Sequence, residues 1–200
     1  MTGDTGDTGG YAQADQVSVI GSPVTWDDLA AFKAAGRFLA GYPSNTRNFY
    51  SPEDDVHRVL LCVLGWATHS IVLNMYGYDD EAVDALLETF AKKPSVYFQA
   101  SLDSSQAAGV HEKAILARWP VDAIGNSIAI GQSTKHAISH LKVCIVDGIY
   151  TISGSTNWSL RGEQQQDNVL TITSDPVLAA EYRSILDRCH AAMLQQMKRQ

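Results

Sequence analysis

Apolar positions along the chain follow two periods, which predict strands and helices in alternation. Short apolar runs rich in β-branched residues indicate buried strands, and longer stretches with apolar residues three or four apart indicate amphipathic helices. The predicted strands are residues 71–76, 96–100, 128–130, 141–146, 149–153 and 169–173. The predicted helices are residues 26–40, 52–66, 79–91, 105–119 and 176–197. This alternation predicts an α/β fold, with a mixed sheet flanked by helices on both faces.

The first 46 residues differ in character from the rest of the chain. Residues 1–20 contain a Gly/Thr/Asp repeat and are predicted to form a flexible acidic tail. Residues 21–46 are predicted to be a helical extension, in which Thr25 caps the helix and Asp28 occupies the capping-box position. The start of the chain lacks a basic region followed by an apolar one, so we expect no secretory signal and a cytoplasmic protein.

The most informative run is HLKVCIVDGIYTISGSTN, residues 140–157. His140 and Lys142 are two apart at the start of an apolar run, so their side chains share one face of a strand. Asp147 and the glycine after it form a strong hairpin signal, and the return strand leads toward residues 154–157. The hairpin therefore predicts that both ends of this run lie close together.

The residue types in this run suit chemistry on a phosphate. Lys142 carries a fixed positive charge for phosphate oxygens, and Ser155 and Asn157 offer neutral hydrogen bonds. His140 can attack as a nucleophile or transfer a proton near neutral pH. We therefore predict that His140, Lys142, Ser155 and Asn157 form the catalytic set.

The spacing His-x-Lys-x4-Asp-x6-Gly-Ser-x-Asn is the signature of the phospholipase D superfamily, which this chain resembles over about residues 47 to 195. Residues 49–53 (FYSPE) and 70–76 (SIVLNMY) resemble the first two strands of the small bacterial Nuc-type endonucleases. Asp167, followed by Asn168, stands where that family usually has Glu-Asn. The resemblance implies a phospholipase D-like mixed sheet and assigns residues 47–200 to a phospholipase D-like catalytic domain.

The resemblance also implies a mechanism of two steps that needs no metal and no cofactor. One histidine attacks phosphorus to give a phosphohistidine, a second histidine protonates the leaving oxygen, and water then releases the product. In this chain the only other His-x-Lys, at residues 111–113, is followed neither by the aspartate nor by Gly-Ser-x-Asn, and it lies in a helical pattern. A homodimer that brings together two copies of His140 is therefore expected. Asp167 is the residue expected to orient His140.

Four further residues are candidates for substrate binding. Lys135 and His136 precede the motif, Trp158 could stack on a base, and Arg161 adds positive charge. The alternatives are a solvated loop for the first two, core packing for Trp158 and an ordinary surface charge for Arg161.

Several other polar residues near these segments favour structural roles. Asp147 and Gly154 are expected to shape the motif, because Asp147 has the opposite strand parity to His140. Glu53 is expected to cap a helix or to lie near the site, and Glu163 to lie on a loop or helix surface. The other histidines, at 57, 69 and 190, are scattered without metal-ligand spacing, and no metal site is predicted.

Charge and cysteine content limit the choice of partner and compartment. The net charge of −7 is unusual for a protein that binds nucleic acid, but residues 104–161 carry five basic and three acidic residues, a local charge of +2. The cysteines, at 62, 144 and 189, lie far apart in apolar segments and are predicted to be buried thiols. No apolar run approaches the length of a membrane span, so stable membrane insertion is not expected.

Three functions remain open at this point. The small size, the single motif and the flanking segments favour a nuclease that cuts DNA or RNA. A phospholipase D or cardiolipin-type lipid phosphodiesterase is the first alternative, although no apolar approach surface is visible in the sequence. A nucleic-acid-binding protein without catalysis is the second, and the complete motif argues against it.

Overall fold

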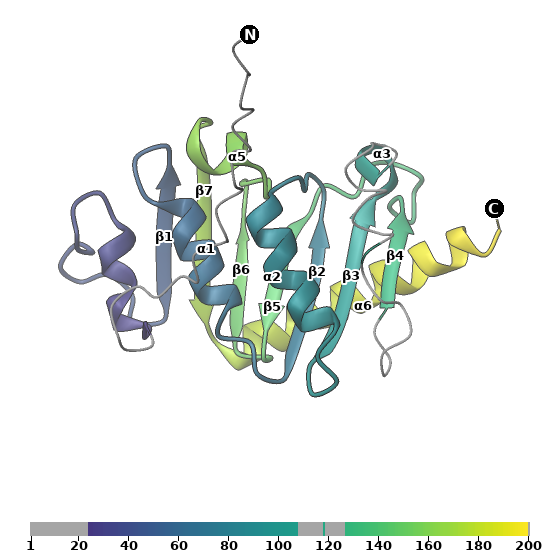
Figure 1. Ribbon diagram of the computed structural model, residues 1–200, viewed down its shortest axis with the longest axis horizontal. Coiled ribbons are helices and arrows are strands. Elements are labelled where there is room, and N and C mark those ends of the chain that lie inside the picture. Colours follow the sequence, from purple (N-terminus) through teal and green to yellow (C-terminus); the bar gives the residue numbers. More distant parts are fainter. Residues whose placement is uncertain (1–23, 108–117, 119–126, 200) are drawn as a thin grey trace, which may run out of the picture.

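A seven-stranded mixed sheet forms the centre of the part of the chain that the structure describes (Figure 1). The structure is a computed structural model that describes residues 24–107, 118 and 127–199. The strands are β1 (Thr46–Ser51), β2 (Ser70–Met75), β3 (Tyr97–Asp103), β4 (Ser127–Gly131), β5 (Lys142–Val146), β6 (Tyr150–Gly154) and β7 (Asn168–Ser174). Their order is β1-β7-β6-β5-β2-β3-β4. The pairs β2–β3 and β3–β4 are parallel and the others antiparallel, which confirms the predicted mixed sheet.

Helices cover both faces of this sheet, as the alternating pattern predicted. They are the 3₁₀ helix η1 (Asp27–Phe32) and the α-helices α1 (Val56–Leu64), α2 (Glu81–Ala91), α3 (Ser104–Ala107), α5 (Leu160–Gln164) and α6 (Pro176–Met197). In Figure 1, α1 and α2 lie in front of the sheet and α6 crosses behind it. Aspartate side chains cap the three longest helices, and Asp55, Asp80 and Asp175 each accept hydrogen bonds from N–H groups of the first turn.

The alternation of side chains along the strands divides the core into two layers. On β5, Cys144 and Val146 belong to the large apolar cluster under α1 and α2. Val143 and Ile145 belong to a smaller cluster under α6. Lys142 has the parity of Cys144, so it belongs to the face that α1 and α2 cover. The long α6 and the tight packing on both faces therefore hold β5 in one register.

The predicted helix over residues 26–40 is wrong beyond its first turns. Only Asp27–Phe32 is helical, as a 3₁₀ helix, and the backbone is extended at Lys33. The Nζ of Lys33 lies 2.5 Å from Oδ2 of Asp54, and it also donates to the carbonyl of Asn48 at 3.2 Å. Asp54 is buried, so its carboxylate requires a cation at this position. The helix ends at Phe32 because this ion pair holds Lys33 in an extended conformation.

The start of the same segment keeps half of the predicted capping box. The Asp28 carboxylate accepts hydrogen bonds from the backbone N–H of Thr25, at 2.9 Å, and from its hydroxyl, at 2.7 Å. Thr25 thus donates its hydroxyl proton to Asp28 and caps no N–H of the helix. With one of the two reciprocal bonds missing, the cap is weaker than the sequence suggested.

Some predictions cannot be compared with the structure. The tail over residues 1–20 and the second His-x-Lys, at residues 111–113, lie outside the described residues. The predicted helix over residues 105–119 is described only as α3 and at residue 118. The predicted strands and the remaining helices are confirmed to within a few residues at each end, and α5 was not predicted.

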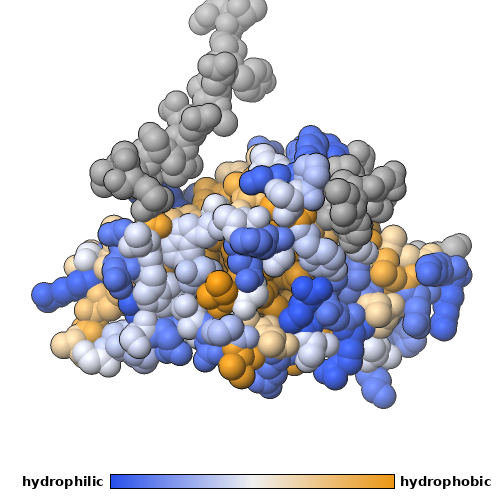
Figure 2. Space-filling view, turned by 90° about the horizontal axis from the view of Figure 1, so that it is seen from below, coloured by the Kyte–Doolittle hydropathy of each residue, from blue (hydrophilic) through white to orange (hydrophobic). Residues whose placement is uncertain are grey.

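The outer surface mixes polar and apolar residues. Figure 2, a view from below the sheet of Figure 1, shows apolar residues interspersed with polar ones. Within the described residues, no helix is both long enough and apolar enough to cross a membrane.

Candidate active site

The motif residues gather at one edge of the sheet, the upper edge in Figure 1. Here β2 and β6 end and β5 begins, because β5 is antiparallel to both neighbours. The register pairs Lys142 with Met75 and Val143 with Ser153. The hairpin therefore returns the Gly-Ser-x-Asn segment to the level of the His-x-Lys segment.

His140 and Lys142 are in direct contact. The Nζ of Lys142 lies 3.0 Å from Nε2 of His140 and 3.2 Å from the His140 carbonyl oxygen. An ammonium group can only donate, so this contact makes Nε2 the acceptor and places the ring proton on Nδ1. Lys142 is buried, with 6% of its surface exposed, whereas His140 is exposed. Burial lowers the pKa of Lys142 from its ordinary value.

The ring of Tyr76 packs against both His140 and Lys142, a contact that the sequence did not predict. Its ring centroid lies 4.6 Å from that of His140 and 4.8 Å from the Nζ of Lys142. The Tyr76 N–H donates to the carbonyl of Leu141 at 2.9 Å, which ties it to the motif strand. The available signal was its place at the end of a predicted strand, but the pairing of that strand with β5 was not known.

Ser155 lies beside an open cleft of about 350 Å³ on the β7 side of the edge. Its hydroxyl donates to Oδ1 of Asn168 at 3.0 Å and accepts from the N–H of Val169 at 3.1 Å. Asp167 is exposed and lines the same cleft, as does Glu53. Among the described residues, none hydrogen-bonds to Nδ1 of His140, so the expected support from Asp167 is not made within one chain. The capping role considered for Glu53 is wrong, because Asp55 caps α1.

Asn157 is held against the loop after β2. A Cβ at Gly77 would lie 2.8 Å from Cγ of Asn157, so only glycine leaves room for this side chain. Oδ1 of Asn157 is buried and has no hydrogen-bond partner among the described residues. Trp158 is 1% exposed and packs edge-on against Tyr78, with ring centroids 6.4 Å apart. The base-stacking interpretation of Trp158 is therefore wrong for this conformation, and core packing describes it.

Asp147 and Gly154 have structural positions. The Asp147 carboxylate accepts hydrogen bonds from the N–H groups of Thr68, His69 and Ser70 and from the Thr68 hydroxyl, at 2.7 to 3.2 Å. It thus anchors the start of β2 at the opposite end of β5 from His140. Gly154 has φ of +146°, and a Cβ there would lie 2.1 Å from the carbonyl oxygen of Val169. Close approach of two strands therefore requires glycine at this position.

The remaining predicted substrate contacts are exposed. Lys135 and His136 lie in the turn before β5, and Arg161 lies on the surface of α5. Arg118, one of the five basic residues of the segment 104–161, forms an ion pair with Asp84. Of the basic residues predicted for the site, Lys142 is the one whose contact with His140 the structure describes, and substrate binding by Lys135, His136 and Arg161 stays a prediction.

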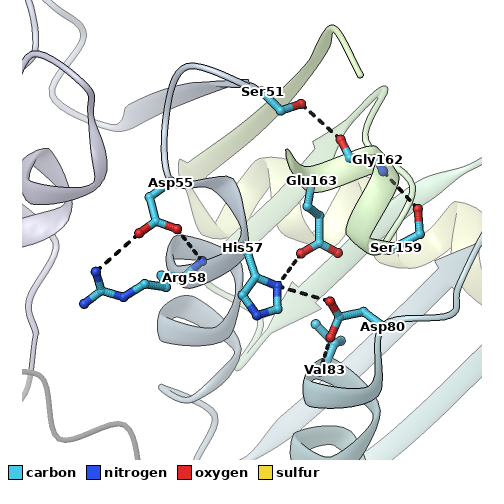
Figure 3. A network of polar contacts seen from close by, with 9 residues as sticks. All are labelled: Ser51, Asp55, His57, Arg58, Asp80, Val83, Ser159, Gly162 and Glu163. Atoms are coloured by element: carbon cyan, nitrogen blue, oxygen red, sulfur yellow. Dashed lines mark hydrogen bonds and ion pairs between the residues drawn. The ribbon is translucent and has the colours of Figure 1, made fainter. Parts of the chain in front are cut away.

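A second polar cluster joins α1, α2 and α5 (Figure 3). The Nδ1 of His57 lies 3.1 Å from Oδ2 of Asp80 and 2.7 Å from Oε2 of Glu163. Hydrogen bonds to these two carboxylates raise the pKa of His57 to about 10, and burial raises the pKa of Glu163 to about 6. Glu163 is 1% exposed, so its predicted place on a loop or helix surface is wrong. No sequence pattern signals this cluster, because 106 residues separate His57 from Glu163.

Comparison with known proteins agrees with this geometry. The family model described as "Cardiolipin synthase, PLD-like domain" matches residues 60–190. The mitochondrial cardiolipin hydrolase of Chlamydomonas reinhardtii is 26% identical over 127 residues, which are 62% of this chain and 53% of that protein. The chain thus spans about half the length of this curated relative.

Solved structures share the fold. Nuc of Salmonella typhimurium, described as a phospholipase D family member, has a TM-score of 0.62 at 23% identity, over 72% of this chain and 92% of Nuc. NucT of Helicobacter pylori has a TM-score of 0.65 at 17% identity, over 74% of this chain and 96% of NucT. With a family match over most of the chain and the complete motif at one edge of the sheet, the protein belongs to the phospholipase D superfamily.

Proposed function

We propose that this protein hydrolyses phosphodiesters through His140 and that its substrate is a nucleic acid. The observation that carries the proposal is the His140–Lys142 contact, in which the unprotonated Nε2 faces a buried ammonium at an exposed sheet edge. A nucleophile needs an unprotonated nitrogen, and a phosphate needs a cation beside it; the lone pair of Nε2 becomes available when the Lys142 ammonium donates to the phosphate instead. Both are present at one point.

The reaction proceeds in two steps. Nε2 of His140 attacks phosphorus and forms a phosphohistidine, while Lys142 offsets the negative charge that builds on the phosphate oxygens. Ser155 and Asn157 donate hydrogen bonds to the same oxygens, for which the Ser155 hydroxyl turns away from Asn168. A second histidine protonates the leaving oxygen, and water then attacks the phosphohistidine and frees the product.

The second histidine is His140 of another copy of the chain. The chain has one complete motif, so a twofold dimer is the simplest arrangement that supplies two such histidines to one phosphate. His140 is exposed, and no described residue hydrogen-bonds to its Nδ1, which leaves this atom open to a group across the dimer axis. Asp167, beside Ser155 in the cleft, acts at the same edge and supports the imidazole in the assembled site.

The choice of nucleic acid follows from the extent of similarity. Nuc and NucT share the fold over 92% and 96% of their own lengths, and the segments before the motif resemble Nuc-type endonucleases. A lipid phosphodiester is the second candidate, which the family model and the cardiolipin hydrolase relative favour. A protein that only binds nucleic acid is the third, and the intact motif disfavours it.

Cleavage assays in EDTA test the proposal. Supercoiled plasmid, single-stranded oligonucleotides and phosphatidyl lipids are incubated with the wild type, with His140→Ala and with His69→Ala as a control at an exposed histidine. Cleavage of nucleic acid by the wild type and the control, but not by His140→Ala, is expected. Turnover by His140→Ala would contradict the mechanism. Turnover of phosphatidyl lipids without cleavage of nucleic acid would show that the substrate is a lipid phosphodiester.

A mixing experiment tests the shared site. Wild type is mixed with an equal amount of His140→Ala, and the subunits are allowed to exchange. About a quarter of the dimers then carry both histidines, so total activity should fall by about half relative to the unmixed wild type. Unchanged activity, in a sample where exchange is confirmed with labelled chains, would show that each chain works alone.

A further inference from the structure

We propose that His57, Asp80 and Glu163 form a binding site for a divalent transition-metal cation, of which Zn²⁺ is the best fit. The site is separate from the His140–Lys142 pair and does not depend on the proposed catalytic function. Its three residues are the second residue of α1, the N-cap of α2 and the fourth residue of α5, and Figure 3 shows the two carboxylates converging on the imidazole.

The first argument is that the buried carboxylate oxygens of Asp80 and Glu163 have too few hydrogen-bond donors. Oδ1 of Asp80 accepts the N–H of Val83, and Oδ2 of Asp80 shares Nδ1 of His57, 3.1 Å away, with Glu163. Oε1 of Glu163 is buried without a hydrogen-bond partner among the described residues. The side chains of Asp80 and Glu163 are 1% and 0% exposed. The single proton on Nδ1 of His57 faces both carboxylates and can serve only one of them well. A buried carboxylate oxygen left unpaired is costly.

The second argument is charge. Two buried carboxylates with one imidazolium leave a net charge of −1 inside the protein, and Asp79 adds a further negative charge near Glu163. A divalent cation bound to two carboxylates and a neutral imidazole leaves no net charge. A divalent cation therefore neutralises both buried carboxylates, whereas one proton on His57 neutralises only one of them.

The third argument is geometry and ligand type. The ligand atoms of the three residues all lie within 4.8 Å of one another. Ligands about 2.1 Å from one Zn²⁺ lie roughly 3 to 4 Å apart, so small side-chain rotations complete the site. One imidazole nitrogen with two carboxylate oxygens suits Zn²⁺ or Mn²⁺, whereas Mg²⁺ and Ca²⁺ prefer oxygen ligands alone. The His57 side chain is 19% exposed, which leaves a path for the ion and for water as a further ligand.

The site would tie the motif to the helices that cover it. Glu163 lies six residues after Asn157, and the carbonyl of its neighbour Gly162 accepts hydrogen bonds from Ser51 and Asn168. A cation that links α5 to α1 and α2 therefore holds the segment that follows Gly-Ser-x-Asn. Its role is structural, because none of its ligands contacts the His140–Lys142 pair in the described residues.

Metal binding to the purified chain tests this inference. After treatment with chelator and dialysis, Zn²⁺ and then Mg²⁺ are titrated by calorimetry into the wild type, Glu163→Gln and His57→Gln. His69→Gln serves as a control for an exposed histidine. We expect one Zn²⁺ per chain in the wild type and in the control, and a loss of affinity of about 100-fold or more in the other two variants. Zn²⁺ should also raise the Tm of the wild type and of the control, but not that of Glu163→Gln.

A second measurement separates this site from the thiols. Co²⁺ bound by one nitrogen and two oxygens lacks the thiolate charge-transfer absorption that coordination by Cys62 or Cys189 would produce. If Zn²⁺ binds with equal affinity to the wild type, Glu163→Gln and His57→Gln, or if thiolate absorption appears, the inference is wrong. The absence of stoichiometric Zn²⁺ binding in the folded wild type would also overturn it. The cleavage assays compare His140→Ala with the wild type in the same EDTA buffer, so both chains have the same cation content and the comparison still isolates His140.

Discussion

Asp147 belongs to the motif, yet the structure predicts that replacing it impairs stability far more than catalysis. Its carboxylate accepts hydrogen bonds from the N–H groups of Thr68, His69 and Ser70 and from the Thr68 hydroxyl. Asn has one acceptor oxygen where Asp has two, so Asp147→Asn leaves at least one of these donors without an acceptor and removes the charge from the others. Bonds to a charged group contribute about 1.5 to 3 kcal/mol each, and the exposed Thr68 and His69 regain some of this from water.

The net cost of Asp147→Asn is therefore about 2 kcal/mol, which for a chain of this size lowers the Tm by about 4 to 8 °C. The dependence on pH has a definite sign. Burial acts to raise the pKa of Asp147, but the bonds from Thr68, His69 and Ser70 outweigh it and lower the pKa below the ordinary 3.8. A carboxylate with a lowered pKa in the folded state stabilises above its ordinary pKa and loses this effect as pH falls through the folded-state value. The difference between wild type and variant should therefore be largest at neutral pH and shrink in acid.

Urea unfolding followed by circular dichroism, repeated from neutral pH down to about pH 3, measures this difference. Asp27→Asn is the matched control, since the Asp27 side chain is 93% exposed and its ion-pair distance to Arg47 is 3.8 Å. This control should change stability by less than about 0.5 kcal/mol. The cleavage rate per folded molecule should be nearly unchanged in Asp147→Asn. A loss of activity of 100-fold with unchanged stability would refute the structural interpretation and indicate a catalytic role.

Three further substitutions test the site. Gly77→Ala should lower the cleavage rate about tenfold or more, because the new Cβ displaces the Asn157 side chain and a small misplacement of a catalytic group is costly. An unchanged rate in a steady-state assay would argue against a role for Asn157. Lys142→Ala should lower the rate by about 100- to 1000-fold because the phosphate loses its cation, with little change in stability; a rate within threefold of wild type would exclude it from the site. Trp158→Ala should cost about 3 to 5 kcal/mol in urea unfolding, as for other buried aromatic residues; lost substrate affinity at unchanged stability would instead support base stacking.

Local patterns in the sequence determined most of the elements of the fold. The alternation of apolar runs and helical periods predicted the strands and most helices, because burial on one or both faces requires these periods. Asp147 with the glycine after it predicted the hairpin, and this hairpin brings together the two halves of the motif. The parity of His140 and Lys142 predicted their contact, since side chains two apart on a strand share a face.

Tertiary contacts decided what these local rules did not cover. The helix expected over residues 26–40 ends early because Lys33 pairs with Asp54, which lies 21 residues away. Tyr76 lies beside His140 only because β2 pairs with β5, and no periodicity within one segment predicts which strands pair. Trp158 was equally compatible with a surface and a core position, and its burial against Tyr78 depends on the loop after β2.

The cluster of His57, Asp80 and Glu163 shows this division most clearly. In the sequence, His57 looked like a structural or surface histidine and Glu163 like a residue of a loop or helix surface, and the separations of the three residues follow no ligand spacing. The motif, the elements and their faces could be predicted from the sequence, because they depend on neighbours a few residues apart. Only the tertiary structure brought three distant helix ends to one point, because strand order and helix packing depend on the burial of the whole core.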